Sequence, residues 1–169
     1  MRLIVLDENF DTLGSIPLFR TLIWVPRYEK LGCFELYTSK DYFWLLNAGK
    51  YLYRNDDEKL GVIDEVNYSQ DENGAREAYA KGNFAEKLLA NRVISEMVTI
   101  SGNTETAMRN LVNQFAINPA DGDRKVEHLR LGEVSGISGT VSAQATGDNL
   151  SDKLYEIGNT QEISHRVRY

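Results

Sequence analysis

The stretch Gly82-Asn-Phe-Ala-Glu-Lys-Leu-Leu-Ala-Asn-Arg92 decides how the chain is organised, because the sequence pattern changes there. Asn83, followed three residues later by Glu86, is typical of a helix start, where the two side chains satisfy free main-chain amides. Strand-like alternation precedes this stretch and helical stripes follow it. We therefore predict an α+β fold, with a β-rich lobe over residues 1–82 and a mixed α+β lobe over residues 83–169.

Before Gly82, short segments have the two-residue period of strands. In Cys33–Thr38, Phe34 and Leu36 share one face, while Glu35 and Tyr37 take the other. The run Leu22–Val25 ends at Pro26, which cannot donate to a strand ladder. Further strands are expected at Leu3–Leu6, at Gly61–Tyr68 and, after a tight turn at Asn73-Gly74, at Arg76–Ala80.

After Gly82, the pattern predicts three helices, the first starting at Asn83. The second has an apolar stripe in which Met108, Leu111, Val112 and Phe115 follow helical spacing. It cannot continue past Pro119. The third covers Leu150–Ile157, with Asn149 as its cap and Gly158 as its stop. We expect these residues to be largely buried: Phe34, Leu36, Val66, Met108, Leu111, Val112, Phe115, Leu150 and Leu154.

Between and after the last two helices, the sequence favours strands. Lys125–Leu131 and Val141–Thr146 are the two candidates between them, joined by a Gly- and Ser-rich stretch, Gly132–Thr140, expected to be a flexible connection. The alternation in Ile163–Tyr169 predicts a final strand. Because the sequence stops inside that strand, we expect the second lobe to be incomplete at its C-terminus.

Composition excludes several classes of function. The 169 residues are 42% hydrophobic and 26% charged, which is ordinary for a globular protein. A net charge of -6 argues against a general nucleic-acid binder. No apolar run approaches the roughly 20 residues of a membrane span, and the start MRLIVLDENF turns acidic too early for a signal peptide. A single cysteine excludes an internal disulfide, consistent with synthesis in a reducing cytoplasm.

The residues that could act in catalysis or bind a metal ion lack the spacing that these functions require. His128 and His165 are isolated, and His165 is expected to be a packing residue. Asp56-Asp57-Glu58 lacks the ligand spacing of a calcium loop, so it is interpreted as a solvated turn. Asp121-Gly122-Asp123 is interpreted as a tight turn. Cys33 has no neighbouring histidine and is expected to be a buried free thiol.

Glycine, serine and aromatic residues give no specific signal either. Gly132, Gly136 and Gly139 precede no phosphate-binding Lys-Ser/Thr. The serines at 135, 138 and 142 lack the strand-to-helix elbow of a nucleophile. We therefore expect no catalytic, cofactor-binding or metal-binding residue. Sugars or bases could stack on the aromatic residues, but core packing or a protein interface needs fewer assumptions; these residues are Trp24, Tyr28, Tyr37, Tyr42, Phe43 and Trp44.

The order of several short motifs resembles that of siphophage and prophage tail-tip proteins. Trp24-Val-Pro-Arg-Tyr28-Glu-Lys-Leu-Gly32-Cys-Phe34-Glu-Leu36 is similar to the opening signature of that family. Near the end of the chain the sequence departs from the family, which usually has a small residue around Ile163–His165, often a glycine, where this chain has Ser164. The other motifs, in the family's order, are Leu60-Gly-Val-Ile63-Asp-Glu-Val66, Gly82–Ile94 with its Leu88-Leu89-Ala-Asn-Arg92-Val-Ile94, Leu111-Val112 through Ile117-Asn-Pro119, and Asn149-Leu150-Ser-Asp-Lys-Leu154.

The resemblance implies an assembly role. It implies that residues 1–82 form an antiparallel β-barrel-like hub lobe, and that the protein is a structural part of a baseplate hub in the virion tail. Its implied partners are the tail tube, distal tail, and fibre or spike proteins, and its implied state is a homo-oligomer, a trimer. It implies no enzymatic activity. The residues themselves predict no cofactor, no nucleic-acid partner and no membrane. Two alternatives stay open: a receptor- or carbohydrate-binding module, and a cell-wall hydrolase associated with a tail.

Overall fold

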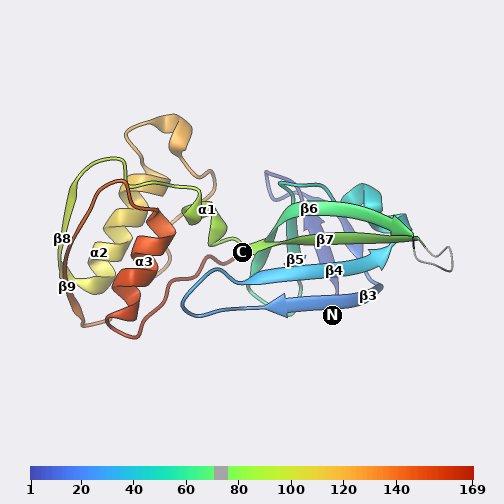
Figure 1. The fold of residues 1–169 in the computed structure, drawn as a ribbon, viewed down its shortest axis with the longest axis horizontal. Coiled ribbons are helices and arrows are strands. Elements are labelled where there is room, and N and C mark those ends of the chain that lie inside the picture. Colours follow the sequence, from blue (N-terminus) through green and yellow to red (C-terminus); the bar gives the residue numbers. More distant parts are fainter. Residues whose placement is uncertain (71–75) are drawn as a thin grey trace. The chain divides into compact units, whose positions relative to one another are not determined.

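The computed structural model describes residues 1–70 and 76–169 (Figure 1). The described chain forms two compact units. Unit 1 contains Met1–Ala85 and the last three residues, Val167–Tyr169, and unit 2 contains Glu86–Arg166. The turn predicted at Asn73-Gly74 lies outside the described residues. That these units are a hub lobe and an incomplete second lobe stays a prediction.

Unit 1 is a seven-stranded sheet in which every neighbouring pair is antiparallel, in the order β2-β1-β5-β6-β7-β4-β3. A short 3-10 helix, η1, follows β4. Figure 1 shows β6, β7, β4 and β3 side by side. The bounds are β1 (Leu3–Leu6), β2 (Thr12–Ile16), β3 (Phe19–Val25), β4 (Cys33–Ser39), η1 (Lys40–Leu45), β5 (Tyr51–Arg54), β6 (Leu60–Gln70) and β7 (Arg76–Phe84).

The sheet is curled, because its two edge strands follow each other in the chain. Only Pro17 and Leu18 separate β2 from β3. A flat sheet of this size would put its edges about 29 Å apart, whereas a link of this length spans only about 10 Å. Thr38 holds the corner by donating a hydrogen bond to the carbonyl of Leu18, 3.0 Å away. No ladder joins β2 to β3 among the described residues. The α+β class is confirmed, but the β-rich part is an open sheet and not a closed barrel.

One face of this sheet carries the core of unit 1. Strand alternation places Phe34 and Leu36 of β4 beside Ala78 and Ala80 of β7, all four at most 1% exposed. The predicted burial of Phe34 and Leu36 is therefore confirmed, while Val66 is only half-buried. The remaining members of the core cluster are Leu3, Val5, Ile16, Leu45, Leu46, Leu52, Ile63 and Phe84.

Unit 2 combines three α-helices with one antiparallel strand pair, β8 and β9. Its helices α2 and α3 start at the asparagine caps Asn103 and Asn149, whose side chains accept the N–H of Thr106 and Asp152. No described helix has the length and apolarity needed to span a bilayer. The bounds are α1 (Lys87–Ala90), β8 (Val98–Asn103), α2 (Thr104–Val112), a π-helical continuation η2 (Asn113–Ile117), the 3-10 turn η3 (Gly122–Arg124), β9 (Thr140–Ala145) and α3 (Leu150–Asn159).

The two longer helices confirm the predicted apolar stripes. Met108, Leu111 and Phe115 are buried, whereas Val112 lies at the border of the stripe and is half-buried. Leu150 and Leu154 are fully buried in α3. Those helices bury one face each, as amphipathic helices do. The strand predicted over Val141–Thr146 is also present, as β9.

Two predictions at helix ends are wrong. Asn83 lies inside β7 and caps nothing, because its side-chain amide donates instead to the carbonyl of Gly32, 3.2 Å away. The first helix is consequently a single turn, Lys87–Ala90. Gly158 does not stop α3, which continues to Asn159. It is required for another reason: a Cβ there would stand 2.4 Å from the carbonyl oxygen of Ile163, where the chain folds back over the helix.

Two predicted strands are absent from unit 2. The segment Lys125–Leu131 contains a turn at Val126 and the left-handed backbone of His128, with φ of 61°, so its alternation never becomes extended. In Ile163–Tyr169, the N–H of Ile163 closes the end of α3 by donating to the carbonyl of Gly158, 3.0 Å away. Only Arg168 forms a bridge, with Lys59, and both residues belong to unit 1.

Candidate functional site

The histidines weighed in the sequence are in different surroundings. His128 is exposed. His165 is half-buried and packs against the ring of Tyr155, with ring centroids 4.3 Å apart. Burial, with Glu86 and Asp152 nearby, raises the pKa of Tyr155 from 10.0 to about 12. Over residues 1–70 and 76–169, no group of three or more His, Cys, Asp or Glu side chains is placed to hold a metal ion.

The acidic clusters are parts of turns. Asp57 accepts hydrogen bonds from the indole N–H of Trp24, at 2.8 Å, and from the N–H of Lys59, at 3.1 Å. Burial opposes ionisation of this carboxyl, but these bonds and the charge of Arg54 together hold its pKa below the ordinary value. Arg54 also pairs with Asp56 at 2.8 Å. In unit 2, Asp121 caps η3 by accepting the N–H of Asp123.

The glycine- and serine-rich stretch of unit 2 is held by side chains from α2, although we expected a flexible connection. The carboxylate of Glu105 accepts the N–H groups of Ser135, at 2.6 Å, and Ile137, at 3.0 Å. Those two bonds are the main reason that the pKa of Glu105 is lowered. Arg109 donates to the carbonyl of Gly132, 2.7 Å away. This stretch therefore has a defined conformation without a strand or helix.

Several residues of the family-like motifs before residue 86 pack together in the core of unit 1. The ring of Trp24 lies 5.7 Å from that of Phe34 and 4.7 Å from that of Phe84, measured between centroids. Gly61 and Gly82 flank Phe34 so closely that a Cβ on either would stand within 3.0 Å of its ring. The spacing of these residues in the sequence did not predict that they pack against one another. The motifs thus describe packing and not a reactive site.

An outward surface of unit 1 carries a pair of tyrosines. Tyr37 of β4 and Tyr79 of β7 are opposite each other in the ladder, and their ring centroids are 4.7 Å apart. Their neighbours in each strand point into the core, so both rings point away from it. Arg20 of β3 lies over the Tyr37 ring, 5.5 Å from its centroid. Burial and the charge of Glu35 raise the pKa of Tyr79.

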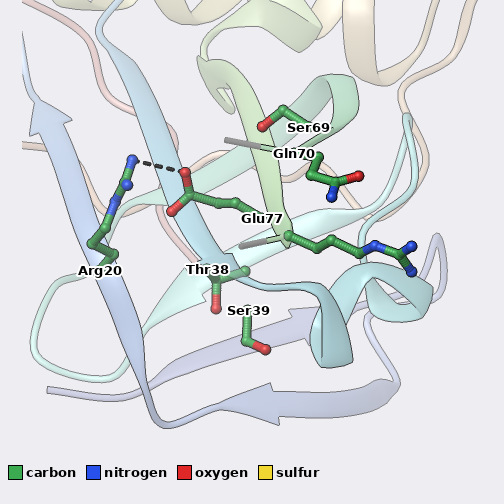
Figure 2. Close-up of a pocket in the computed structure, with 7 residues that line it drawn as sticks. Arg20, Thr38, Ser39, Ser69, Gln70 and Glu77 are labelled. Atoms are coloured by element: carbon green, nitrogen blue, oxygen red, sulfur yellow. Dashed lines mark ion pairs between the residues drawn. The ribbon is translucent and has the colours of Figure 1, made fainter. Parts of the chain in front are cut away.

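Arg20 also belongs to a pocket at one end of these strands. Its guanidinium pairs with Glu77 of β7 at 2.7 Å, which Figure 2 shows as a dashed line. The pocket has a volume of about 270 Å³. Every lining residue that the structure describes is polar: Arg20, Thr38, Ser39, Ser69, Gln70, Arg76 and Glu77. No pattern in the sequence marks these residues, because they come from four different strands.

Apolar side chains are exposed at the same end of unit 1. Phe43 of η1 and Tyr68 of β6 make an edge-to-face contact, with centroids 5.5 Å apart, and both are partly exposed. Trp44 is 68% exposed and Leu18 is 75% exposed. Of the aromatic residues weighed in the sequence, Trp24 and Tyr42 pack on the core, while Tyr28, Phe43 and Trp44 face solvent.

Comparison with known proteins gives a family and a fold. Residues 2–169 match the model of a family described as Siphovirus ReqiPepy6 Gp37-like protein. The fold is similar to that of prophage tail protein gp18 from Listeria monocytogenes EGD-e, with a TM-score of 0.61 and 10% identity over 94% of this chain and 45% of that one. A tail protein from Neisseria meningitidis MC58 gives a TM-score of 0.49 and 10% identity over 65% of this chain and 32% of that one.

This chain spans less than half the length of either of those tail proteins. No curated protein matches its sequence. At 10% identity, the likeness to the Listeria protein shows a shared fold. The family match covers nearly the whole chain, which therefore belongs to the Siphovirus ReqiPepy6 Gp37-like family.

Proposed function

We propose that this chain is the leading part of a tail-tip hub protein, a structural component that joins the tail tube to the distal tip of a phage or prophage tail. The family match over residues 2–169 carries this proposal. The fold shared with a prophage tail protein over 94% of the chain supports it. The proposed place of the protein is the virion tail, after synthesis in the bacterial cytoplasm.

Two features of unit 1 support an assembly role. The edge strands β2 and β3 each have one side without a strand partner among the described residues, and such edges can add a further strand. The exposed Leu18, Phe43, Trp44 and Tyr68 lie at one end of the sheet, where a neighbouring protein would cover them. The proposed neighbours are tail-tube, distal-tail, and fibre or spike proteins. By family resemblance, the proposed state is a homo-trimer.

The proposed role involves no catalysis. One member of each acidic cluster noted in the sequence is engaged in structure: Asp57 binds Trp24 and Asp121 caps η3. Glu105 likewise holds the loop after Gly132. A cell-wall hydrolase would need carboxylates that face a substrate cleft. The engagement of these carboxylates therefore favours the structural role over the hydrolase alternative.

Antibody labelling of virions tests where in the particle the protein lies. We expect gold-labelled antibodies against residues 1–169 to bind the distal end of the tail in electron micrographs. Deleting the gene should leave heads and no complete tails. Labelling of heads, or particles that form complete tails without the gene, would contradict the proposal.

Light scattering on the full-length protein tests the proposed oligomeric state and should give a trimer. A protein that stays monomeric at high concentration would contradict the proposed homo-trimer.

A charge on the sheet edge tests whether unit 1 makes the assembly contacts. Ile23 of β3 is 42% exposed, and Ile23→Lys should lower the yield of infectious particles by blocking strand addition. Val93 of unit 2 is equally exposed at 42%, so Val93→Lys is the matched control. Equal yields from the two variants would show that this edge is not used.

A further inference from the structure

The pocket of unit 1 has an unusual lining for a protein cavity. Small-molecule sites are lined mostly by apolar residues with a few polar ones, whereas the seven lining residues that the structure describes are all polar. Its volume of about 270 Å³ is enough for one small ring. A ligand that fits would offer hydrogen-bonding groups to the polar ends of these side chains and apolar surface to their carbon stems.

The pocket also presents both kinds of hydrogen-bonding group close together. The Arg20 guanidinium offers donors only and the Glu77 carboxylate acceptors only, and their ion pair at 2.7 Å fixes the two side by side. The hydroxyl of Ser69 can do either, whereas that of Ser39 already donates to the carboxylate of Asp41 and accepts its N–H. Ser39, Glu77 and Ser69 lie in one row across β4, β7 and β6. Adjacent hydroxyls of a ligand, each both donor and acceptor, match this arrangement.

An aromatic surface lies directly beside the pocket. Tyr79 is two residues from Glu77 and Tyr37 is two residues from Ser39, so the tyrosines share one face of the sheet with this part of the pocket lining. Arg20 connects them, because it lies over the Tyr37 ring and pairs with Glu77. The exposed parts of two adjacent phenol rings can pack against the apolar C–H face of a ring whose rim carries hydroxyls.

We propose that this face of unit 1 binds a saccharide, with one sugar ring in the pocket and the next against Tyr37 and Tyr79. Tyrosine and arginine are also frequent at protein hot spots. The cores of protein interfaces, however, are depleted of charge, whereas the lining of this pocket includes Arg20, Arg76 and Glu77. The polar pocket therefore favours a sugar over a protein side chain. This inference goes beyond the tail role and does not depend on it.

Two NMR measurements on the full chain test the site, saturation transfer to the sugars and 1H–15N spectra of the protein amides, with glucose, N-acetylglucosamine, rhamnose and glucuronic acid as probes. We expect at least one sugar to bind with millimolar affinity and to shift the amide signals of Ser39, Ser69 and Glu77. Arg76→Ala, a change at an exposed position, should weaken binding about tenfold, as should Tyr79→Ala. Tyr53→Ala, a change of a half-exposed tyrosine on β5, is the matched control and should bind normally.

Three outcomes overturn the proposal. The first is that none of the four sugars binds at high millimolar concentration. The second is binding that persists unchanged in Arg76→Ala and Tyr79→Ala. The third is a concentration-dependent self-association that Tyr79→Ala abolishes while the sugars have no effect, which would make this face a protein interface.

Discussion

Unit 1 and unit 2 are held together in different ways. Unit 1 depends on a strand ladder and on the packing of aromatic rings against glycines, as where Phe34 lies between Gly61 and Gly82. Unit 2 uses long polar side chains that bind the main chain of distant loops. Arg92 donates to the carbonyl of Lys125, at 3.2 Å, and Arg109 to that of Gly132, at 2.7 Å. The first kind of unit is sensitive to added volume, and the second to lost hydrogen bonds.

The largest expected effect is at Gly82. In Gly82→Ala the new Cβ would stand 1.8 Å from the main-chain oxygen of Val62, which cannot move without breaking the β6–β7 ladder. We expect a loss of about 3 kcal/mol or more in the free energy of unfolding. Denaturant titration measures it. Gly122→Ala, where nothing lies within 4 Å, is the control and should change stability by less than about 0.5 kcal/mol.

The next effect is in the apolar part of unit 2. Leu111→Ala removes a side chain that is 2% exposed, and the cavity should cost about 2–5 kcal/mol. Hydrogen exchange followed by mass spectrometry should show the change mainly within residues 86–166. A cost well under 1 kcal/mol would mean that the α2 stripe contributes little and that polar contacts alone hold unit 2.

A smaller effect is expected at the loop held by α2. Glu105→Gln keeps the shape but puts an amide NH2 where an acceptor is needed, so exchange of the Ser135 and Ile137 amides should rise about tenfold. The folded-state pKa of Glu105 is lowered, so its contribution to stability is present above pH 4.5 and is lost as the pH falls through the lowered value. The difference between wild type and variant should therefore shrink in acid. Equal exchange at neutral pH would show that the loop does not need this carboxylate.

The smallest effect appears only in alkali. Because the pKa of Tyr155 is raised from 10.0 to about 12 in the folded protein, the unfolded chain ionises first and stability falls between those two pH values. Tyr155→Phe should lose less stability over that range than the wild type. Thermal melts between about pH 9 and about pH 12 measure it. A Tyr155 phenol that titrates near pH 10 by ultraviolet absorbance would contradict the expectation.

The same contrast explains what could be predicted from sequence. Period-two alternation predicted β4, which buries one face. The Val, Ile and Tyr content of Gly61–Tyr68 predicted β6, and the turn signal before Arg76 predicted β7. The helical stripe gave α2, and Asn149 gave the start of α3. In Lys125–Leu131 the alternation was misleading, because long-range bonds from Arg92 and a positive φ at His128 decide the backbone there. No local pattern reports a contact between residues 33 positions apart.

The pocket was beyond prediction for a related reason. Its seven residues come from β3, β4, β6 and β7, and none of them is unusual within its own strand. They become neighbours only through the register of the ladders, such as the row Ser39–Glu77–Ser69. The aromatic residues drew attention in the sequence, but the structure sends Trp24 to the core and leaves Tyr37 beside the pocket.

The last three residues are synthesised long after the part of unit 1 that they contact. Tyr169 donates its N–H to the carbonyl of Glu58, at 3.1 Å, and Arg168 pairs with the side chain of Glu58 at 3.0 Å. Unit 2, residues 86–166, is inserted before them. At roughly 5–20 residues per second, a ribosome needs about 4–16 seconds to make that insertion. The sheet of unit 1 therefore leaves the ribosome well before the segment that completes its turn at Glu58, and the nascent chain must keep that position open until translation reaches Tyr169.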